Sequence, residues 1–271
     1  MDDHKIFGNC LAREITKKLL NPLYQRKVIA LVGPDYIGKY FYLKNEIIKF
    51  IDPVDLYEAD HNIDSIRIMH NFLLTAPANS SYKSVIFNDA HLLNDPSQDA
   101  LLKICEEPPE HCKIFIIMSD KNKLSKPLYS RIQEFVDWNL LNNEEMLEFI
   151  ESEQLNKNDQ LLELSRGRPA LYKILNDDSR FMEFNECLNL VVVNPKLMHP
   201  TPVIIQKCND FSIRKIVAFI CTQFANKRDF NSDKEMMKSM IIHQFAGILI
   251  SDPSVNAEIY WKRMIVQLSV I

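Results

Sequence analysis

Residues 84–131 decide the fold, and they read SVIFNDAHLLNDPSQDALLKICEEPPEHCKIFIIMSDKNKLSKPLYSR. The apolar runs 85–87 and 113–118 each close on polar residues, which is typical of strands buried on both faces of a sheet. Between them, an apolar stripe at helical spacing predicts a helix with Asp95 as its N-cap and Pro96 at the first helical position. Two strands joined by a helix of this length form a right-handed parallel unit. The stretch therefore predicts an α/β fold built on a parallel sheet.

Polar side chains mark the ends of both predicted strands. Asn88 and Asp89 follow the first strand, and Ser119 follows the second. In open parallel sheets, ligands bind beyond the carboxyl ends of the strands. We therefore expect the chemistry of this protein at that edge of the sheet.

A second motif lies nearer the N-terminus, where the loop Gly33-Pro-Asp-Tyr-Ile-Gly38-Lys39 separates an apolar run, 27–32, from a helical stretch. Strand, Gly-x-x-x-x-Gly-Lys and helix is the context of a phosphate-binding loop, whose backbone N–H groups, helix N-terminus and lysine attract a phosphate. The chain has only five glycines, and two of them bracket this loop. Tyr40 follows, where such loops carry a Ser or Thr that binds Mg²⁺. The alternative is a tight strand–helix turn with a solvated lysine.

The remaining chain extends the α/β pattern and then leaves it. Segments 54–59 and 135–138 predict further strands, and 144–176 predicts a group of short helices. From residue 178 onward the sequence is typical of an all-helical domain. A length of 271 residues allows more than one domain, and no apolar run approaches the roughly 20 residues of a membrane span.

Cysteine content and charge exclude several classes of protein. The six cysteines form no CxxC pair, which favours reduced thiols in a cytoplasmic protein and argues against a structural zinc site. The net charge is −4, so a nucleic-acid contact would need a local basic patch. We expect no metal site.

Two motifs in the opening stretch resemble one protein family. Residues 99–109, DALLKICEEPP, are similar to the Ala-Leu-Leu-Lys-x-x-Glu-Glu-Pro-Pro helix of the AAA+ clamp-loader ATPases of DNA replication, most closely the delta-prime type. Ser130-Arg131 is similar to the family's Ser-Arg-Cys motif, with Ile132 in place of the cysteine. The resemblance covers about residues 1–175. The small size and the absent zinc ribbon indicate a divergent subunit, such as a phage-encoded one.

The resemblance implies an architecture and a set of partners. It implies an AAA+ P-loop-type parallel sheet with helices over residues 1–138, a helical lid over 139–177 and an all-α collar for oligomerisation over 178–271. The implied partners are other clamp-loader subunits in a ring, the sliding clamp and primer–template DNA, with no membrane contact.

The second nucleotide motif of the family is degraded in this chain. Family members carry Asp-Glu-Ala-His or similar after the third strand, and this chain has Asn88-Asp89-Ala90-His91. Aligned so, Asn88 replaces the Mg²⁺-binding Asp, and Asp89 replaces the base Glu with one methylene fewer. Shifted by one residue, Asp89 becomes the metal ligand, and Ala90 stands where the base belongs. Neither register leaves a complete hydrolytic site, because an uncharged amide holds a metal less well than a carboxylate.

We therefore expect no intrinsic ATPase activity, and no cofactor unless the degraded site still binds ATP with Mg²⁺. Asp89 has an N-cap of the following turn as its alternative role. Arg168 is either a sensor of nucleotide in the lid turn or a structural residue at a helix end. The candidate nucleotide-site residues are Gly33, Gly38, Lys39, Tyr40, Asn88, Asp89, Ser119 and Arg168.

Arg131 is the catalytic candidate. The resemblance makes it an arginine finger that reaches the γ-phosphate held by a neighbouring subunit, and the alternative is a surface arginine in one modest salt bridge. The rival functions are an active clamp-loader ATPase that tolerates Tyr40 and Asn88, and a stand-alone AAA+ adaptor without a clamp. The lysines that are candidates for contact with a DNA backbone are Lys83, Lys121, Lys123 and Lys126.

Overall fold

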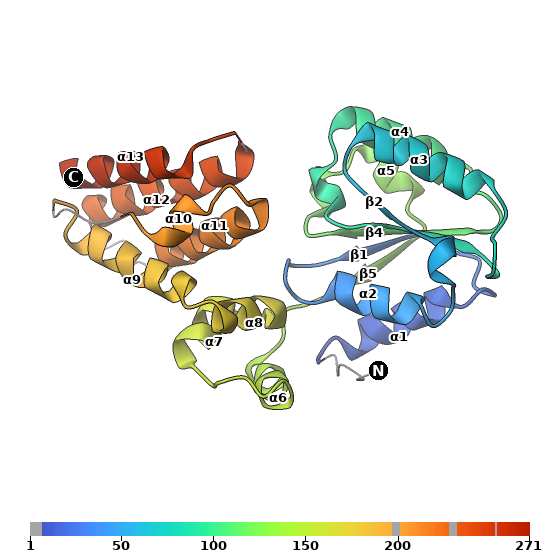
Figure 1. The fold of residues 1–271 in the computed structure, drawn as a ribbon, viewed down its shortest axis with the longest axis horizontal. Helices are drawn as coiled ribbons and strands as arrows, with labels where there is room; N and C mark the ends of the chain where they lie inside the picture. Colours follow the sequence, from blue (N-terminus) through green and yellow to red (C-terminus); the bar gives the residue numbers. More distant parts are fainter. Residues whose placement is uncertain (1–6, 197–200, 228–231, 253) are drawn as a thin grey trace. The chain divides into compact units, whose positions relative to one another are not determined.

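A computed structural model describes residues 7–196, 201–227, 232–252 and 254–271. The chain divides into two compact units, residues 1–171 and 172–271. The first unit holds the sheet, and the second is helical (Figure 1). None of the described helices is long and apolar enough to cross a bilayer.

The first unit is built on one five-stranded sheet in which all neighbours are parallel, as the sequence predicts. The strand order is β2-β3-β4-β1-β5. The central strands β1 and β4 are buried along their whole length, which explains their unbroken apolar runs. The strands are β1 (Val28–Val32), β2 (Leu56–Ala59), β3 (Lys83–Phe87), β4 (Cys112–Met118) and β5 (Glu134–Asp137).

Helices cover both faces of this sheet (Figure 1). On one face lie α1 (Cys10–Leu20) and α2 (Lys39–Ile47), and on the other lie α3 (Ile63–Leu74), α4 (Asp95–Glu106) and α5 (Lys126–Arg131). Alternate residues of a strand point to opposite faces of the sheet. Ile29 packs with α1 and α2, whereas Val28 and Ala30 pack with α3, α4 and α5. The unit is therefore a three-layer α/β/α domain.

Two predicted boundaries are wrong for local reasons. Helix α4 is capped by Asn94, not Asp95, because the extended Asn94 accepts the Ser97 N–H at 3.0 Å. Strand β2 starts at Leu56 instead of residue 54, because residues 53–55 form a 3₁₀ turn.

Buried lysines tie helix ends to the sheet. Lys83 Nζ on β3 donates to Phe72 O at 2.8 Å and to Thr75 Oγ1, where α3 ends. Lys113 Nζ on β4 donates to Asn21 O at 2.7 Å, just past the end of α1. An ammonium suits these sites because the last carbonyls of a helix lack partners and carry partial negative charge. The expectation that Lys83 is available to DNA is therefore wrong, since the residue is buried and its ammonium binds acceptors inside the domain.

Three short helices follow β5: α6 (Asn143–Ser152), α7 (Asp159–Ser165) and α8 (Pro169–Asp177). The turn before α8 depends on Gly167, which has φ 73°. A Cβ at this position would lie 2.3 Å from Leu141 O, so only glycine lets the two backbone segments approach.

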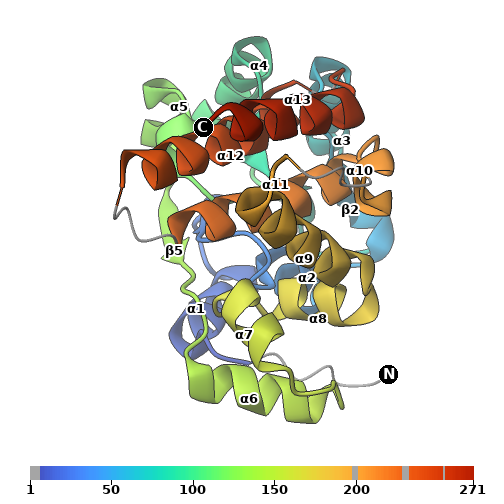
Figure 2. The same cartoon turned by 90° about the vertical axis from the view of Figure 1, so that its left-hand side faces the viewer.

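The second unit contains α9 (Arg180–Val193), α10 (Val203–Gln206), α11 (Phe211–Asn226), α12 (Asp233–Ser251) and α13 (Ala257–Val270) (Figures 1 and 2). The all-helical prediction is confirmed, and α10 is the element that it missed. Helix α11 packs most extensively on α12, and α12 packs in turn on α13. The fully buried Trp261 lies at the centre, with its ring 5.5 Å from Phe184 and 5.8 Å from Phe245.

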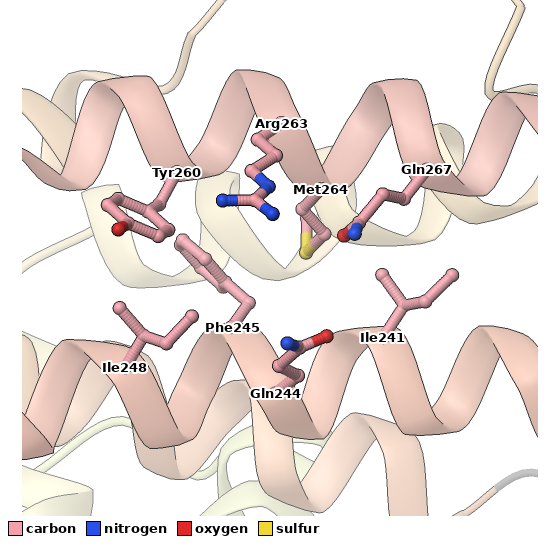
Figure 3. Close-up of a pocket in the computed structure, with 8 residues that line it drawn as sticks. All are labelled: Ile241, Gln244, Phe245, Ile248, Tyr260, Arg263, Met264 and Gln267. Carbon is pink, nitrogen blue, oxygen red and sulfur yellow. The ribbon is translucent and has the colours of Figure 1, made fainter.

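Two further features of this unit are a buried arginine and a small cavity. The buried Arg214 donates to Cys208 O, to Asp252 O at 3.0 Å and to Val255 O at 2.6 Å, and so joins two interhelical loops. A cavity of about 30 Å³ lies between α12 and α13, beside Gln244 (Figure 3). It is far too small for an organic ligand.

Candidate degenerate nucleotide site

The loop 33–39 joins β1 to α2 and has the backbone of a phosphate-binding loop. Gly33 has φ 154°, and a Cβ there would lie 2.1 Å from Trp138 O. Gly38 has φ 94° and occupies the N-cap position of α2. Both glycines are therefore required by conformation, which explains why a glycine-poor chain retains them.

Lys39 faces its own loop. Its ammonium donates to Pro34 O at 2.7 Å and to Gly33 O, and the residue is 6% exposed. The positive charge of the loop thus lies against backbone carbonyls of the loop itself. A phosphate would have to draw the lysine away from these acceptors.

The hydroxyl of Tyr40 is bound to side chains of the same domain. The phenol donates to Glu58 on β2 and accepts from Lys44 Nζ at 3.1 Å. Lys44 and Glu58 also form an ion pair at 2.8 Å. Burial and the bond to Glu58 raise the pKa of Tyr40, so the hydroxyl keeps its proton. The side chain of tyrosine is longer than that of serine, and its hydroxyl therefore reaches Glu58 on β2.

Tyr36 is the site residue that the sequence reasoning missed. It has φ 64°, unusual for a residue with a side chain, and its carbonyl accepts the Ala170 N–H at 3.1 Å. Burial, then the carboxylates of Asp35 and Asp89, raises the pKa of its phenol. The phenol is therefore within electrostatic range of Asp89, which follows β3. An aromatic residue inside a glycine-bracketed loop was the available signal.

The polar strand ends lie where the sequence predicts them. Val32 pairs with Met118, so the residues that follow, Gly33 and Ser119, are neighbours at the carboxyl edge. The carbonyl of Asn88 accepts from His61 Nε2 at 2.7 Å. Asp89 precedes a 3₁₀ turn with φ 52°, but its carboxylate does not cap that turn. Asp89 is thus the N-cap residue of this turn by position, as the alternative has it, but it forms no side-chain cap bond.

Arg168 is brought to the loop by the turn before α8. Its guanidinium donates to Arg166 O at 3.3 Å. Burial lowers its pKa, and the carboxylate of Asp35 opposes that shift. The bond from the Ala170 N–H to Tyr36 O places the start of α8 against the loop.

The donor set does not fit Mg²⁺. A magnesium site beside a nucleotide needs hydroxyl and carboxylate oxygens, and here Tyr40 is bound to Glu58 while Asn88 contributes only an amide. Within the described part of the chain, no three His, Cys, Asp or Glu side chains group to hold a metal ion. The backbone of the loop suits a phosphate, but the side chains do not complete a hydrolytic centre.

Arg131 lies apart from these residues, at the last position of α5. Its Nη2 is 3.1 Å from Glu106 Oε1, and its Nη1 is 3.5 Å from Ser130 Oγ. The side chain is 45% exposed. Among the described residues, its side chain binds Glu106 and Ser130 and none of the candidate nucleotide-site residues.

Comparison with known proteins agrees with these motifs. The model of the family described as "DNA polymerase III, delta subunit" matches residues 43–137. The DNA polymerase III subunit tau of Bacillus subtilis is 30% identical over 118 residues, which are 42% of this chain and 21% of that protein. The tau subunit of Escherichia coli is 32% identical over 88 residues, 32% of this chain and 14% of that protein. Over residues 43–137 the chain is similar to the delta subunit family of DNA polymerase III.

Solved structures show the same fold. A gamma subunit-related protein of DNA polymerase III from Thermotoga maritima aligns with a TM-score of 0.59 and 17% identity, over 95% of this chain and 98% of that one. The RuvB Holliday junction branch migration motor of the same organism aligns with a TM-score of 0.51 and 16% identity, over 96% and 88%. At such identities the match shows a shared fold alone. The aligned region spans only about a fifth of the Bacillus relative's length.

Proposed function

We propose that this chain is a clamp-loader subunit of a DNA replication complex that serves the ATPase site of a neighbouring subunit and lacks an active site of its own. The observation that carries the proposal is a contrast within residues 1–171. In the nucleotide site, the hydroxyl of Tyr40 is bound to Glu58. On α5, by contrast, the guanidinium of Arg131 is exposed and bound at only two of its nitrogens among the described residues.

Arg131 acts in this proposal as a finger in trans. Its fixed charge stabilises the negative charge that develops on the phosphate held by the neighbour, a role that contributes about 10³- to 10⁵-fold in phosphoryl transfer. The chain's own loop keeps the backbone of a nucleotide site, with Lys39 and Arg168 as contacts for any nucleotide that still binds. The role of this loop in the proposal is then structural.

The proposed partners follow from the remaining surfaces. Residues 1–138 form the AAA+ module, 139–177 the lid and 178–271 the collar that joins the ring. On α12, Met236, Met237 and Met240 are each more than half exposed, and methionine is enriched at protein interfaces. We assign this surface to neighbouring subunits.

The sliding clamp and primer–template DNA complete the proposed assembly, which works in the cytoplasm. Lys121, Lys123 and Lys126 are exposed around the start of α5 and remain the candidates for contact with the DNA backbone. Their contribution would weaken as salt rises, since it depends on the release of counterions.

The test is the steady-state ATPase of the loader assembled with its partner subunits, sliding clamp and primed DNA. Arg131→Ala should leave assembly intact, because an exposed arginine contributes little to stability. It should lower hydrolysis at the served site by up to about 10³-fold. Arg131→Lys should rescue poorly, because a flexible point charge does not reproduce the planar fork.

Lys39→Ala in the same chain is the comparison, and it should change the rate of the complex far less. If Arg131→Ala matches the wild type while Lys39→Ala abolishes activity, this chain is the hydrolysing subunit. If the purified chain joins no loader and no clamp, a stand-alone adaptor is the better assignment.

A further inference from the structure

The ion pair between Arg131 and Glu106 joins the ends of two separate helices. Glu106 is the last residue of α4, and Arg131 is the last residue of α5, 25 positions later. The pair is the one link from Arg131 to another element among the residues that the structure describes. The direction in which the guanidinium points therefore depends on where α4 holds its carboxylate.

Helix α4 is the firmer of the two supports. Each helix has one fully buried leucine, but α4 has 12 residues and a side-chain cap from Asn94, whereas α5 has six residues and no side-chain cap. The prolines that follow Glu107 prevent the helix from extending further. Glu106 thus stands at a fixed point, and it can orient a longer and more mobile side chain.

The position of Glu106 is unfavourable for the helix itself. The carboxyl end of a helix carries partial negative charge, so an acidic side chain in its last turn opposes the macrodipole. Helix α4 nevertheless ends in Glu106, with Glu107 directly after it. Helix stability does not explain Glu106, whereas its contact with Arg131 at 3.1 Å gives it a role.

The geometry leaves the arginine able to bind a second anion. A guanidinium has five N–H donors. Glu106 occupies Nη2 through a single oxygen, and Ser130 lies near Nη1 at 3.5 Å. Nε and the second N–H of each terminal nitrogen make no hydrogen bond to the described residues. Glu106 therefore orients the group without using up its donors.

We propose that Glu106 is a positioning residue for Arg131, holding the guanidinium in the direction from which it meets the neighbouring subunit's phosphate. This inference rests on the proposed function of Arg131 as a finger in trans. A positioned finger needs less reordering at the moment of reaction, so the effect belongs to the chemical step and not to nucleotide binding.

The experiment is the ATPase of the assembled loader with clamp and primed DNA. Glu106→Gln should lower kcat about twofold to fivefold, the range in which an exposed ion pair acts, with KM for ATP unchanged. Glu107→Gln is the matched control, because it removes the same charge one residue later from a side chain without a polar partner in the described structure. It should match the wild type, and thermal unfolding of the chain should be the same for both variants.

The decisive comparison is made in the Arg131→Ala background, where Glu106→Gln should cause no further loss. If Glu106→Gln lowers kcat equally with and without Arg131, Glu106 acts through some other route. If Glu106→Gln matches or exceeds the wild type while Arg131→Ala is impaired, the pair is not a positioning device, and the finger still stands. If Arg131→Ala itself has no effect, the proposed function fails first.

Discussion

Asp55 ties together the chain segments that enter β2 and β3 at the amino edge of the sheet, although nothing in the sequence marks it. The side chain is fully buried at the start of β2. Its carboxylate accepts the backbone N–H groups of Ala78, Asn79 and Ser80 at 2.7, 2.9 and 2.9 Å. The loop before β3 is thus folded around one buried charge.

We expect Asp55→Asn to lower the free energy of unfolding of the first unit by about 2–3 kcal/mol. The amide keeps one acceptor oxygen, so at least one of the N–H groups loses its partner, and a buried polar group without a partner costs about 1–3 kcal/mol. The bonds that remain also lose the strength that a charged acceptor gives them. At a denaturant slope of about 2–3 kcal/mol per M of urea, the midpoint should fall by about 1 M.

The loss should depend on pH in a defined direction. Burial alone would raise the pKa of Asp55, but its hydrogen bonds with the backbone of residues 78–80 and with the Ser80 hydroxyl outweigh burial and lower that pKa. A lowered pKa stabilises the fold above the unfolded value of about 3.9, and this stabilisation is lost as the pH falls through the folded value. The gap between wild type and Asp55→Asn should therefore be constant from about pH 5 to 7 and shrink below about pH 4.

The assay is urea unfolding followed by the fluorescence of Trp138, with Trp261→Phe in every variant so that only the first unit reports. Asp52→Asn is the control. Asp52 Oδ1 caps the Val54 N–H at 3.0 Å, and asparagine caps equally well, so this change should stay within about 0.5 kcal/mol. A loss below about 1 kcal/mol for Asp55→Asn, or a gap at pH 3 as large as the gap at pH 7, would refute the reasoning.

Three further outcomes are expected. The isolated chain should hydrolyse ATP far more slowly than about 1 s⁻¹, because Tyr40 is bound within the domain; phosphate release near that rate that disappears in Lys39→Ala would contradict this. Met236→Lys combined with Met240→Lys should change stability by less than about 0.5 kcal/mol but weaken ring assembly in size-exclusion chromatography; unchanged assembly would remove this part of α12 from the interface. Arg214→Met should destabilise residues 172–271 by about 3 kcal/mol, since it strips a donor from buried carbonyls; hydrogen exchange as slow as in the wild type would show that these contacts are dispensable.

Consecutive residues suffice to predict the fold class and the kind of loop that joins β1 to α2. Strands β1, β3 and β4 appear as apolar runs because both faces of a central parallel strand are buried, and that requirement is met residue by residue. The loop 33–39 is equally predictable, because it needs glycine at positive φ and a lysine at the start of the helix, and both are visible in consecutive residues. The resemblance of residues 99–109 to a clamp-loader helix is likewise contained in consecutive residues.

The roles of the charged and phenolic side chains, by contrast, depend on contacts between segments that are distant in the sequence. Lys83 was a candidate for DNA contact, and it caps α3 from inside the domain. Tyr40 was a substituted metal ligand, and it is bound to Glu58 on a strand 18 residues away. Arg131 forms an ion pair with Glu106, which lies 25 residues earlier in the chain. Apolar periodicity reports whether a side chain is buried, but a hydrogen bond needs a particular partner at about 3 Å, and that partner is chosen by how distant segments pack.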